Sequence, residues 1–254
     1  MALKITWLGS ASFMLEDSAG RVVFIDPWLD ADSGNPGCPI KVEDVARADL
    51  VLVTHGDPSH YGRGDSVRVA VKTGCRYASN APLCKYIVDN GLLPSSQVLP
   101  LAIDQLHRLK FIDVTVFSVI HPPYLVPLNS DVPGEPNTGF CITMGGVSVL
   151  YTGDTVSGDA VYRRVAAECN PLVGCFPISG ASGEGHGTIE ESVELAASIT
   201  GMASVKYVFP HYRYSPKNPA VGMLSDAVQP LGVKVVMLEP GQVFLAKNGV
   251  SGKS

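Results

Sequence analysis

The sequence lacks any apolar run long enough to cross a bilayer, and its lysines and arginines are scattered rather than clustered. A membrane-spanning helix needs about 20 consecutive apolar residues, whereas even stretches such as 50–54 and 147–151 end in polar residues within a few positions. The net charge of −5 provides no positive field for a phosphate backbone. We therefore expect a small-molecule substrate, with neither a membrane nor a nucleic acid as partner.

Export and disulfide signals are missing as well. Residues 1–10 lead directly into a strand pattern, without the basic region, apolar stretch and small-residue cleavage site of a secretory signal. The six cysteines include no Cys-x-x-Cys spacing. We expect a cytoplasmic protein whose cysteines are reduced and mostly buried, and none of them is expected to bind zinc.

No linker rich in Ser, Gly or Pro and no internal repeat divides the chain, so residues 1–254 are expected to form a single domain. The first three strands are expected at 4–8, 12–16 and 21–26, with a hairpin turn at 17–20. Strands that alternate with helices and also form hairpins favour two packed sheets flanked by helices. The pattern thus predicts a mixed α/β fold, a four-layer αββα sandwich.

The rest of the chain continues this alternation. Helices are expected at 42–48, 66–73, 82–89, 160–168, 189–200 and 220–229. Strands are expected at 50–54, 76–79, 97–101, 108–111, 114–120, 139–144, 147–151, 172–178, 206–209 and 233–238. Thr188 and Glu191 have the spacing of a capping box at the start of the helix over 189–200, and Ile189, Val193 and Ala196 give that helix an apolar face.

Several metal-capable side chains stand where apolar runs end. Four such runs stop at His55, His121, Asp154 and His211. The runs are typical of strands covered on both faces, and loops that follow strands often carry functional groups. Five of the six histidines follow or lie just beyond a run of this kind: His55, His60, His121, His186 and His211. Imidazoles combined with one or two carboxylates suit zinc, manganese or iron, so the pattern predicts a metal site.

Each of these residues also has a structural interpretation. A single histidine after a strand is more often hydrogen-bonded in place than a ligand, and Asp154 has the position of a helix cap. His186 could serve only to position the loop 179–187. Asp26, which ends the run 22–25, is expected to have a structural or ligand-supporting role before Pro27. The combination of residues, rather than any single one, favours the metal site.

Residues 54–62, THGDPSHYG, resemble the T-H-x-H-x-D-H-x-G signature of the metallo-β-lactamase superfamily. His55 and His60 match, whereas Asp57 replaces the second histidine and Ser59 replaces the aspartate. The similarity covers nearly the whole chain. The sequence resembles most closely the bacterial and archaeal UlaG-like metal-dependent hydrolases, typified by ascorbate-6-phosphate lactonase. Its matching stretches are 5–9, 25–29, 38–44, 137–140, 151–155, 185–188 and 210–212, while Ser10 replaces the usual histidine of the family. The resemblance implies an αββα sandwich of the metallo-β-lactamase type and a metal-dependent hydrolase.

The resemblance also implies a ligand set. The corresponding positions are His55, Asp57 and His121 for a first ion, His60 and His211 for a second, and Asp154 as the carboxylate that bridges both. The neutral hydroxyl of Ser59 is a poor ligand, so a second ion should bind more weakly. The carboxylate of Asp57 adds a hard oxygen ligand to the first site and shifts its preference from zinc toward manganese or iron. This shift does not decide which metal binds. One or two ions remain open, as does an alternative in which Asp57 turns into the place left by Ser59.

The implied reaction is hydrolysis by a metal-activated water that attacks a small lactone, ester or amide, anionic metabolites included. Ser59 stands where the family orients this water, so Asp57 or Asp154 is the expected general base, and we group Ser59 with the substrate-binding residues. Two alternatives stay open. One is a phosphodiesterase of the same fold acting on a small phosphodiester, and the other is a degenerate, non-catalytic member that binds metal.

Three further residues are candidates for contact with the substrate. His186 and Tyr212 could donate hydrogen bonds to the developing oxyanion, which makes His186 a catalytic candidate too. Arg213 could bind an anionic group, although a solvated loop residue is the slightly favoured interpretation. The sequence leaves the oligomeric state open, a homo-oligomer included.

Overall fold

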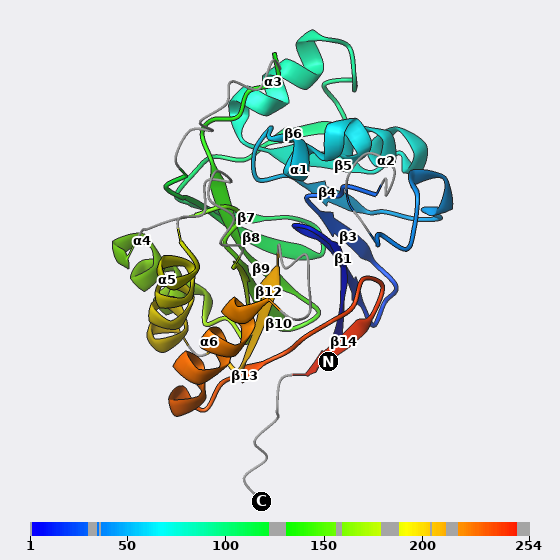
Figure 1. Cartoon of the computed structure of the whole chain (residues 1–254). Coiled ribbons are helices and arrows are strands. Elements are labelled where there is room, and N and C mark those ends of the chain that lie inside the picture. The colour runs from blue at the N-terminus through cyan, green and yellow to red at the C-terminus, as the bar shows by residue number, and fades with distance from the viewer. Residues whose placement is uncertain are drawn as a thin grey trace, which may run out of the picture.

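The computed structural model describes residues 2–29, 35, 37–121, 131–155, 159–178, 188–203, 205–211 and 218–247. Its strands form two seven-stranded sheets that pack face to face (Figure 1). The first sheet has the order β14 (Val243–Lys247), β1 (Ala2–Gly9), β2 (Ser12–Asp17), β3 (Val22–Ile25), β4 (Leu50–Leu52), β5 (Arg76–Ser79), β6 (Val98–Pro100). The second has the order β13 (Lys234–Val235), β12 (Tyr207–His211), β11 (Val173–Pro177), β10 (Val147–Tyr151), β9 (Thr138–Met144), β8 (Ile112–Ser118), β7 (Gln105–Arg108).

Each sheet is antiparallel in one half and parallel in the other. Strands β14 to β3 and β7 to β10 pair antiparallel with their neighbours, whereas β3 to β6 and β10 to β13 pair parallel. The turn between β2 and β3 forms at the expected place, where the carboxylate of Asp17 accepts hydrogen bonds from the backbone N–H groups of Ala19 (2.9 Å) and Arg21 (3.1 Å). Parallel strands need long crossovers, and most of the helices lie in these connections.

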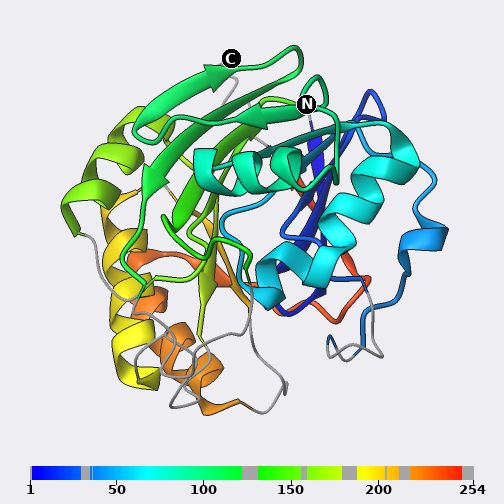
Figure 2. The same ribbon diagram turned by 90° about the horizontal axis from the view of Figure 1, so that it is seen from above.

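The apolar residues separate into three layers. The inner faces of both sheets share one core, which contains Ile5 and Phe13 from the first sheet and Val116 and Phe140 from the second. Outer layers lie under α2 (Asp65–Thr73) and α3 (Ala81–Asp89) on the first sheet, and under α4 (Asp159–Cys169), α5 (Ile189–Met202) and α6 (Pro219–Val228) on the second. Seen from above, helices flank the paired sheets on both sides (Figure 2). The predicted αββα sandwich is therefore confirmed.

Some elements differ from their predicted form. The helix expected at 42–48 is only a 3-10 turn, η1 (Val42–Asp44), because the chain then turns extended and buries Val45 and Ala48 against the sheet. The strand expected at 108–111 is wrong in position: β7 pairs with β8 at Gln105–Arg108, and the N–H of Leu109 closes the hairpin on the carbonyl of Ile112 (2.9 Å). Strand β14 and the short helix α1 (Pro58–Tyr61) were not expected.

Other local predictions hold. Thr188 and Glu191 form the predicted capping box of α5, with Thr188 N–H to Glu191 Oε2 at 2.7 Å and Glu191 N–H to Thr188 Oγ1 at 3.2 Å. All six cysteines are free thiols, four of them buried. Within the described ranges, no helix combines the length and the apolar character that crossing a bilayer would require.

Candidate metal centre

The expected ligands come from strand ends on both sheets. His55 and Asp57 follow β4, and His60 lies on α1, which begins directly after Asp57. His121 follows β8, Asp154 follows β10, and His211 ends β12. Because β8, β10 and β12 run in the same direction, their carboxyl ends meet at one edge of the second sheet. Facing strand ends of the two sheets thus bring together residues that are far apart in sequence.

All six expected ligands are buried. His55, His60, Asp154 and His211 are completely inaccessible, whereas Asp57 and His121 each retain 7% exposure. Buried imidazoles and carboxylates are unfavourable unless they are paired or bind a cation. Asp57 and His121 therefore mark the side from which solvent or a ligand can approach.

Glycines let the ligand loops pack against other backbone. A Cβ atom on Gly56 would lie 2.2 Å from the carbonyl oxygen of Pro133. Gly153 has a φ of +59°, and a Cβ there would lie 3.0 Å from the carbonyl oxygen of Thr138. The hydroxyl of Thr138 donates to the carbonyl of Thr54 (2.7 Å), which ties the loop before His55 to the second sheet. These contacts set the backbone that carries the ligands.

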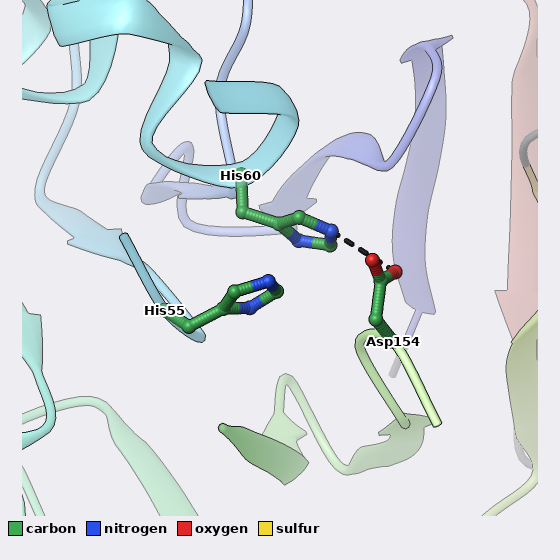
Figure 3. Close-up of side chains that lie close together, drawn as sticks. All are labelled: His55, His60 and Asp154. Atoms are coloured by element: carbon green, nitrogen blue, oxygen red, sulfur yellow. Dashed lines mark ion pairs between the residues drawn. The ribbon is translucent and has the colours of Figure 1, made fainter. Parts of the chain in front are cut away.

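Two groups of donor atoms within the described residues lie close enough together to hold a metal ion. His55, His60 and Asp154 form one group (Figure 3), and His55, Asp57 and His121 form the other. Within each group the donor atoms lie within 4.8 Å of one another. The Nε2 atom of His55 lies 3.2 Å from Oδ2 of Asp57. The two groups share His55, which makes it the centre of the cluster.

Asp154 spans the two groups. Its Oδ1 lies 3.0 Å from Nε2 of His60, and its Oδ2 lies 3.3 Å from Nε2 of His121. One carboxylate thus presents its two oxygens to histidines of different groups. This is the arrangement expected of the bridging carboxylate.

Thr54 and Asp26 fix the orientation of two imidazoles. The Thr54 hydroxyl donates its single hydrogen to Oδ2 of Asp26 (2.8 Å), so at its 3.0 Å contact with Nδ1 of His55 the imidazole must be the donor. Nδ1 of His60 lies 2.6 Å from the same Asp26 oxygen. With Nδ1 carrying the proton, Nε2 of each histidine is left to point toward the cluster, as a metal ligand requires.

Tyr151 links this network to His211. Its hydroxyl donates to Oδ2 of Asp26 (2.8 Å) and also contacts the carbonyl of Ala11 (2.9 Å). Its ring stacks on the imidazole of His211, with centroids 5.5 Å apart and planes at 17°. Asp26 thus contacts Thr54, His60 and Tyr151, as its expected structural or ligand-supporting role requires. Thr54 and Tyr151 received no such role from the sequence, although both belong to stretches that match the family.

The electrostatics of the two central histidines differ. Burial alone would lower the pKa of His60, but the carboxylates of Asp154 and Asp26 raise it to about 10. Burial and the neighbouring His60 lower the pKa of His55, with Asp57 and Asp154 opposing them. The carboxylates thus favour a positive charge here, either a second proton on His60 or a bound cation in its place, while His55 stays neutral and able to bind a cation.

The other predicted site residues either lie outside the two donor groups or fall outside the described residues. Within the described residues, His211 and Ser59 belong to neither donor group, and Ser59 lies half-buried on α1. Asp57 lies with His55 and His121, which favours its place at the first ion over the alternative near Ser59. The predictions for His186, Tyr212 and Arg213 fall outside the described residues.

The donor set fits a divalent metal ion. Imidazole nitrogens and carboxylate oxygens bind zinc at about 2.0–2.2 Å, so donors around one ion lie about 3–4 Å apart. Donor atoms within 4.8 Å of one another need only a small contraction to reach that geometry. The same donors also suit manganese and iron.

Comparisons with known proteins agree with this fold and with a metal-dependent hydrolase. A family model described as a beta-lactamase superfamily domain matches residues 4–199. A UPF0173 metal-dependent hydrolase from Archaeoglobus fulgidus is 32% identical over 247 residues, covering 95% of this chain and 98% of the relative. Another from Methanosarcina mazei is 28% identical over 242 residues, covering 94% of this chain and 97% of the relative.

A solved structure has the same fold. Igni18, described as a novel metallo hydrolase from the archaeon Ignicoccus hospitalis, aligns with a TM-score of 0.75 at 24% identity, covering 98% of this chain and 100% of that one. The chain therefore belongs to the metallo-β-lactamase superfamily and, within it, to the UPF0173 metal-dependent hydrolases. The superfamily predicted from the sequence is confirmed, whereas the narrower UlaG-like grouping stays a prediction.

Proposed function

We propose that this protein hydrolyses a small lactone, ester or amide by means of one or two divalent ions held by His55, Asp57, His60, His121 and Asp154. The observation that carries the proposal is the pair of donor groups joined at His55 and spanned by Asp154. His211 completes the proposed set, since its ring is held by Tyr151 next to the Asp26 network.

A divalent cation in this site would lower the pKa of a water from about 15.7 to near 7 and polarise the oxygen of the substrate. The residues of the chain supply the proton transfer and the orientation. Asp57 is the preferred general base, because it retains 7% exposure while Asp154 is fully buried with an imidazole at each oxygen. Oδ2 of Asp57 lies 3.2 Å from Nε2 of His55 and is placed to bind the ion, so Oδ1 is the oxygen that would accept the proton.

The proposed substrate reaches the site from the side of Asp57 and His121, the two ligands with residual exposure. His186 and Tyr212 remain our candidates to donate to the oxyanion, Arg213 to bind an anionic group, and Ser59 to contact the substrate. For the metal we propose zinc or manganese, with iron as a third choice, because Asp57 adds a hard oxygen ligand to His55 and His121.

The test is an assay of protein freed of metal and then loaded separately with Zn²⁺, Mn²⁺ or Fe²⁺. The substrates are lactones, p-nitrophenyl esters and simple amides, with bis(p-nitrophenyl) phosphate as the phosphodiester. We expect carbonyl substrates to be hydrolysed faster than the diester, and His121→Ala to lose both metal and turnover. His107→Ala is the matched control, because His107 lies half-buried on β7 with Nε2 2.9 Å from the carbonyl of Ala102.

Three results would count against the proposal. Faster hydrolysis of the diester would favour the phosphodiesterase alternative. Bound metal without turnover of any substrate would favour the non-catalytic alternative. Turnover that persists in His121→Ala would show that the reaction does not use this cluster.

A further inference from the structure

We propose that Cys141 and Cys169 form an oxidisable dithiol, a modification site separate from the metal centre, which closes to a disulfide when it reacts with a hydroperoxide. The two cysteines come from different layers of the sandwich. Cys141 lies on β9 in the second sheet, and Cys169 is the last residue of α4 in the helix layer. The bond would therefore join a helix to the sheet beneath it.

The side chains of the pair are already in contact. Cys141 and Cys169 share a side-chain hydrogen bond, and Cys169 also has a hydrogen bond with Thr115. Thr115 lies directly opposite Cys141 in the pairing of β8 with β9, so the two side chains lie next to each other on the same face of the sheet. On α4, Tyr162, Val165 and Cys169 recur at helical spacing and pack into the same core as Cys141. Packing thus holds the two thiols together.

The two thiols differ in accessibility and in acidity. Cys141 is 1% exposed, whereas Cys169 is half-buried and reachable from solvent. The hydrogen bond from Cys141 lowers the pKa of Cys169 to about 7 despite its burial, and Thr115 adds to this effect. The same hydrogen bond, together with burial, raises the pKa of Cys141 well above its ordinary value. Cys169 is thereby the attacking thiolate and Cys141 the resolving thiol.

The reaction balances with a hydroperoxide as the oxidant. The thiolate of Cys169 attacks one peroxide oxygen, the O–O bond breaks, and the sulfenic acid of Cys169 forms while the other oxygen leaves as water after it gains a proton. The sulfur of Cys141 then attacks the sulfur of Cys169 and forms the S–S bond, and the hydroxyl leaves as a second water with the proton of Cys141. Two thiols are oxidised and one peroxide is reduced to two waters.

The other cysteines provide internal references. Cys38 is half-buried as well, but its thiol donates to the carbonyl of Ile40 at 3.3 Å. Cys75, Cys84 and Cys175 are buried, and burial raises the pKa of each thiol. A thiol with a pKa near 7 is about half ionised at neutral pH, against a few per cent for an ordinary thiol. We therefore expect Cys169 to be oxidised at lower peroxide doses than Cys38.

The experiment titrates the reduced, full-length protein with hydrogen peroxide at pH 7, alkylates remaining thiols under denaturing conditions, and maps tryptic peptides by mass spectrometry. Fragmentation spectra distinguish Cys169 from Cys175, because trypsin leaves both in the peptide 165–206. We expect a linked pair of peptides carrying Cys141 and Cys169 at peroxide doses that leave Cys38 alkylated. In Cys141→Ala, Cys169 should instead accumulate as a sulfenic acid that dimedone traps. In Cys169→Ser, Cys141 should stay a thiol because it is 1% exposed.

Cys38→Ser is the matched control and should leave the linked pair unchanged. Two results would overturn the proposal. One is oxidation of Cys38 at the same or a lower dose than Cys169. The other is conversion of wild-type Cys169 to sulfinic acid without a link to Cys141. Circular dichroism of each variant shows whether it is folded, and the wild-type dose series tests the proposal even if one variant is not.

Discussion

At the scale of single residues, one threonine hydroxyl organises the centre of the cluster. Thr54 donates to Asp26, and its position beside Nδ1 of both His55 and His60 directs the opposite nitrogens of these rings toward the donor groups. Partners behind a metal ligand fix its tautomer and its orientation, and removing such a partner often weakens metal binding 10- to 100-fold, as an order of magnitude. The chemistry of the site therefore depends on residues that do not bind the ion.

His55 should be harder to replace than Asp57, because its Nε2 is within reach of both donor groups and can bind an ion at either, whereas Asp57 belongs to one group. We expect His55→Ala to lose essentially all tightly bound metal and Asp57→Asn to retain part of it. Metal content after dialysis, measured by plasma mass spectrometry, distinguishes the two variants. Equal metal content in both would mean that His55 does not connect the groups.

Tyr151→Phe should weaken metal binding by about tenfold or more, because it removes the hydroxyl that orients Asp26 but keeps the ring that stacks on His211. Competition titration with a fluorescent chelator measures the affinity. Tyr77→Phe is the control, since Tyr77 is equally buried but packs in the apolar layer under the outer helices of the first sheet. If the two variants bind metal equally well, Tyr151 has no positioning role.

The sequence pattern identified the candidate metal ligands, but it did not identify Thr54 and Tyr151, the residues that hold those ligands in place. Histidines and aspartates after apolar runs can be recognised because strand ends bring functional groups together. Thr54 and Tyr151 could not be recognised in this way, since each belongs to a run that would be buried whatever its role. Their function depends on hydrogen bonds across 28 and 125 positions of sequence to Asp26, which no local pattern contains.

At the scale of elements, short loops between the sheets determine where the ligands lie. Gly56 packs so closely on Pro133 that a side chain at this position would displace one of the two loops. Helix α1 starts at Pro58, which suits the first turn of a helix because proline has no N–H to leave unsatisfied there. The loop after β4 and the short helix α1, rather than strand backbone, thus carry the ligands of the first sheet.

Gly56→Ala should reduce metal affinity and lower the Tm, because its Cβ would lie 2.2 Å from the carbonyl oxygen of Pro133. Gly222→Ala on α6 should instead stabilise the protein by about 0.5–1 kcal/mol, because nothing lies within 4 Å of its Cβ and alanine favours a helix. Urea unfolding of both variants compares them. The same direction of change in both would contradict the packing described for Gly56.

Strand and helix periodicity predicted most of the elements, and the exceptions have local causes. The segment at 42–48 has apolar spacing that suits a helix, but Val45 and Ala48 reach the sheet in an extended conformation. Strand β14 was not predicted, because Val243 and Leu245 are exposed and its sequence looks like that of a surface segment. Only its pairing with β1 defines it as a strand. Tertiary pairing of this kind overrides local preference.

At the scale of the whole molecule, the candidate centre lies between the two halves of the sandwich. His55, Asp57 and His60 belong to the half with the first sheet, whereas His121 and Asp154 belong to the second. A cation bound by this set would link the two sheets, in addition to the apolar core that they share. Metal binding and folding should therefore be coupled.

Removal of the metal should lower the Tm of the folded protein. An ion that binds only the native state at 100 times its Kd adds about 2.7 kcal/mol to the free energy of unfolding. We expect the chelator EDTA to lower the Tm of the metal-loaded wild type but not that of His55→Ala. A drop of equal size in both proteins would mean that the stabilising ion binds somewhere else.

The most direct test of the metal centre is anomalous diffraction from crystals loaded with Zn²⁺ or Mn²⁺, measured on both sides of the absorption edge of the metal. We predict an anomalous peak among His55, Asp57 and His121, and a second, weaker one between His60 and Asp154. Metal peaks only on the protein surface, with none in contact with His55, would contradict the account.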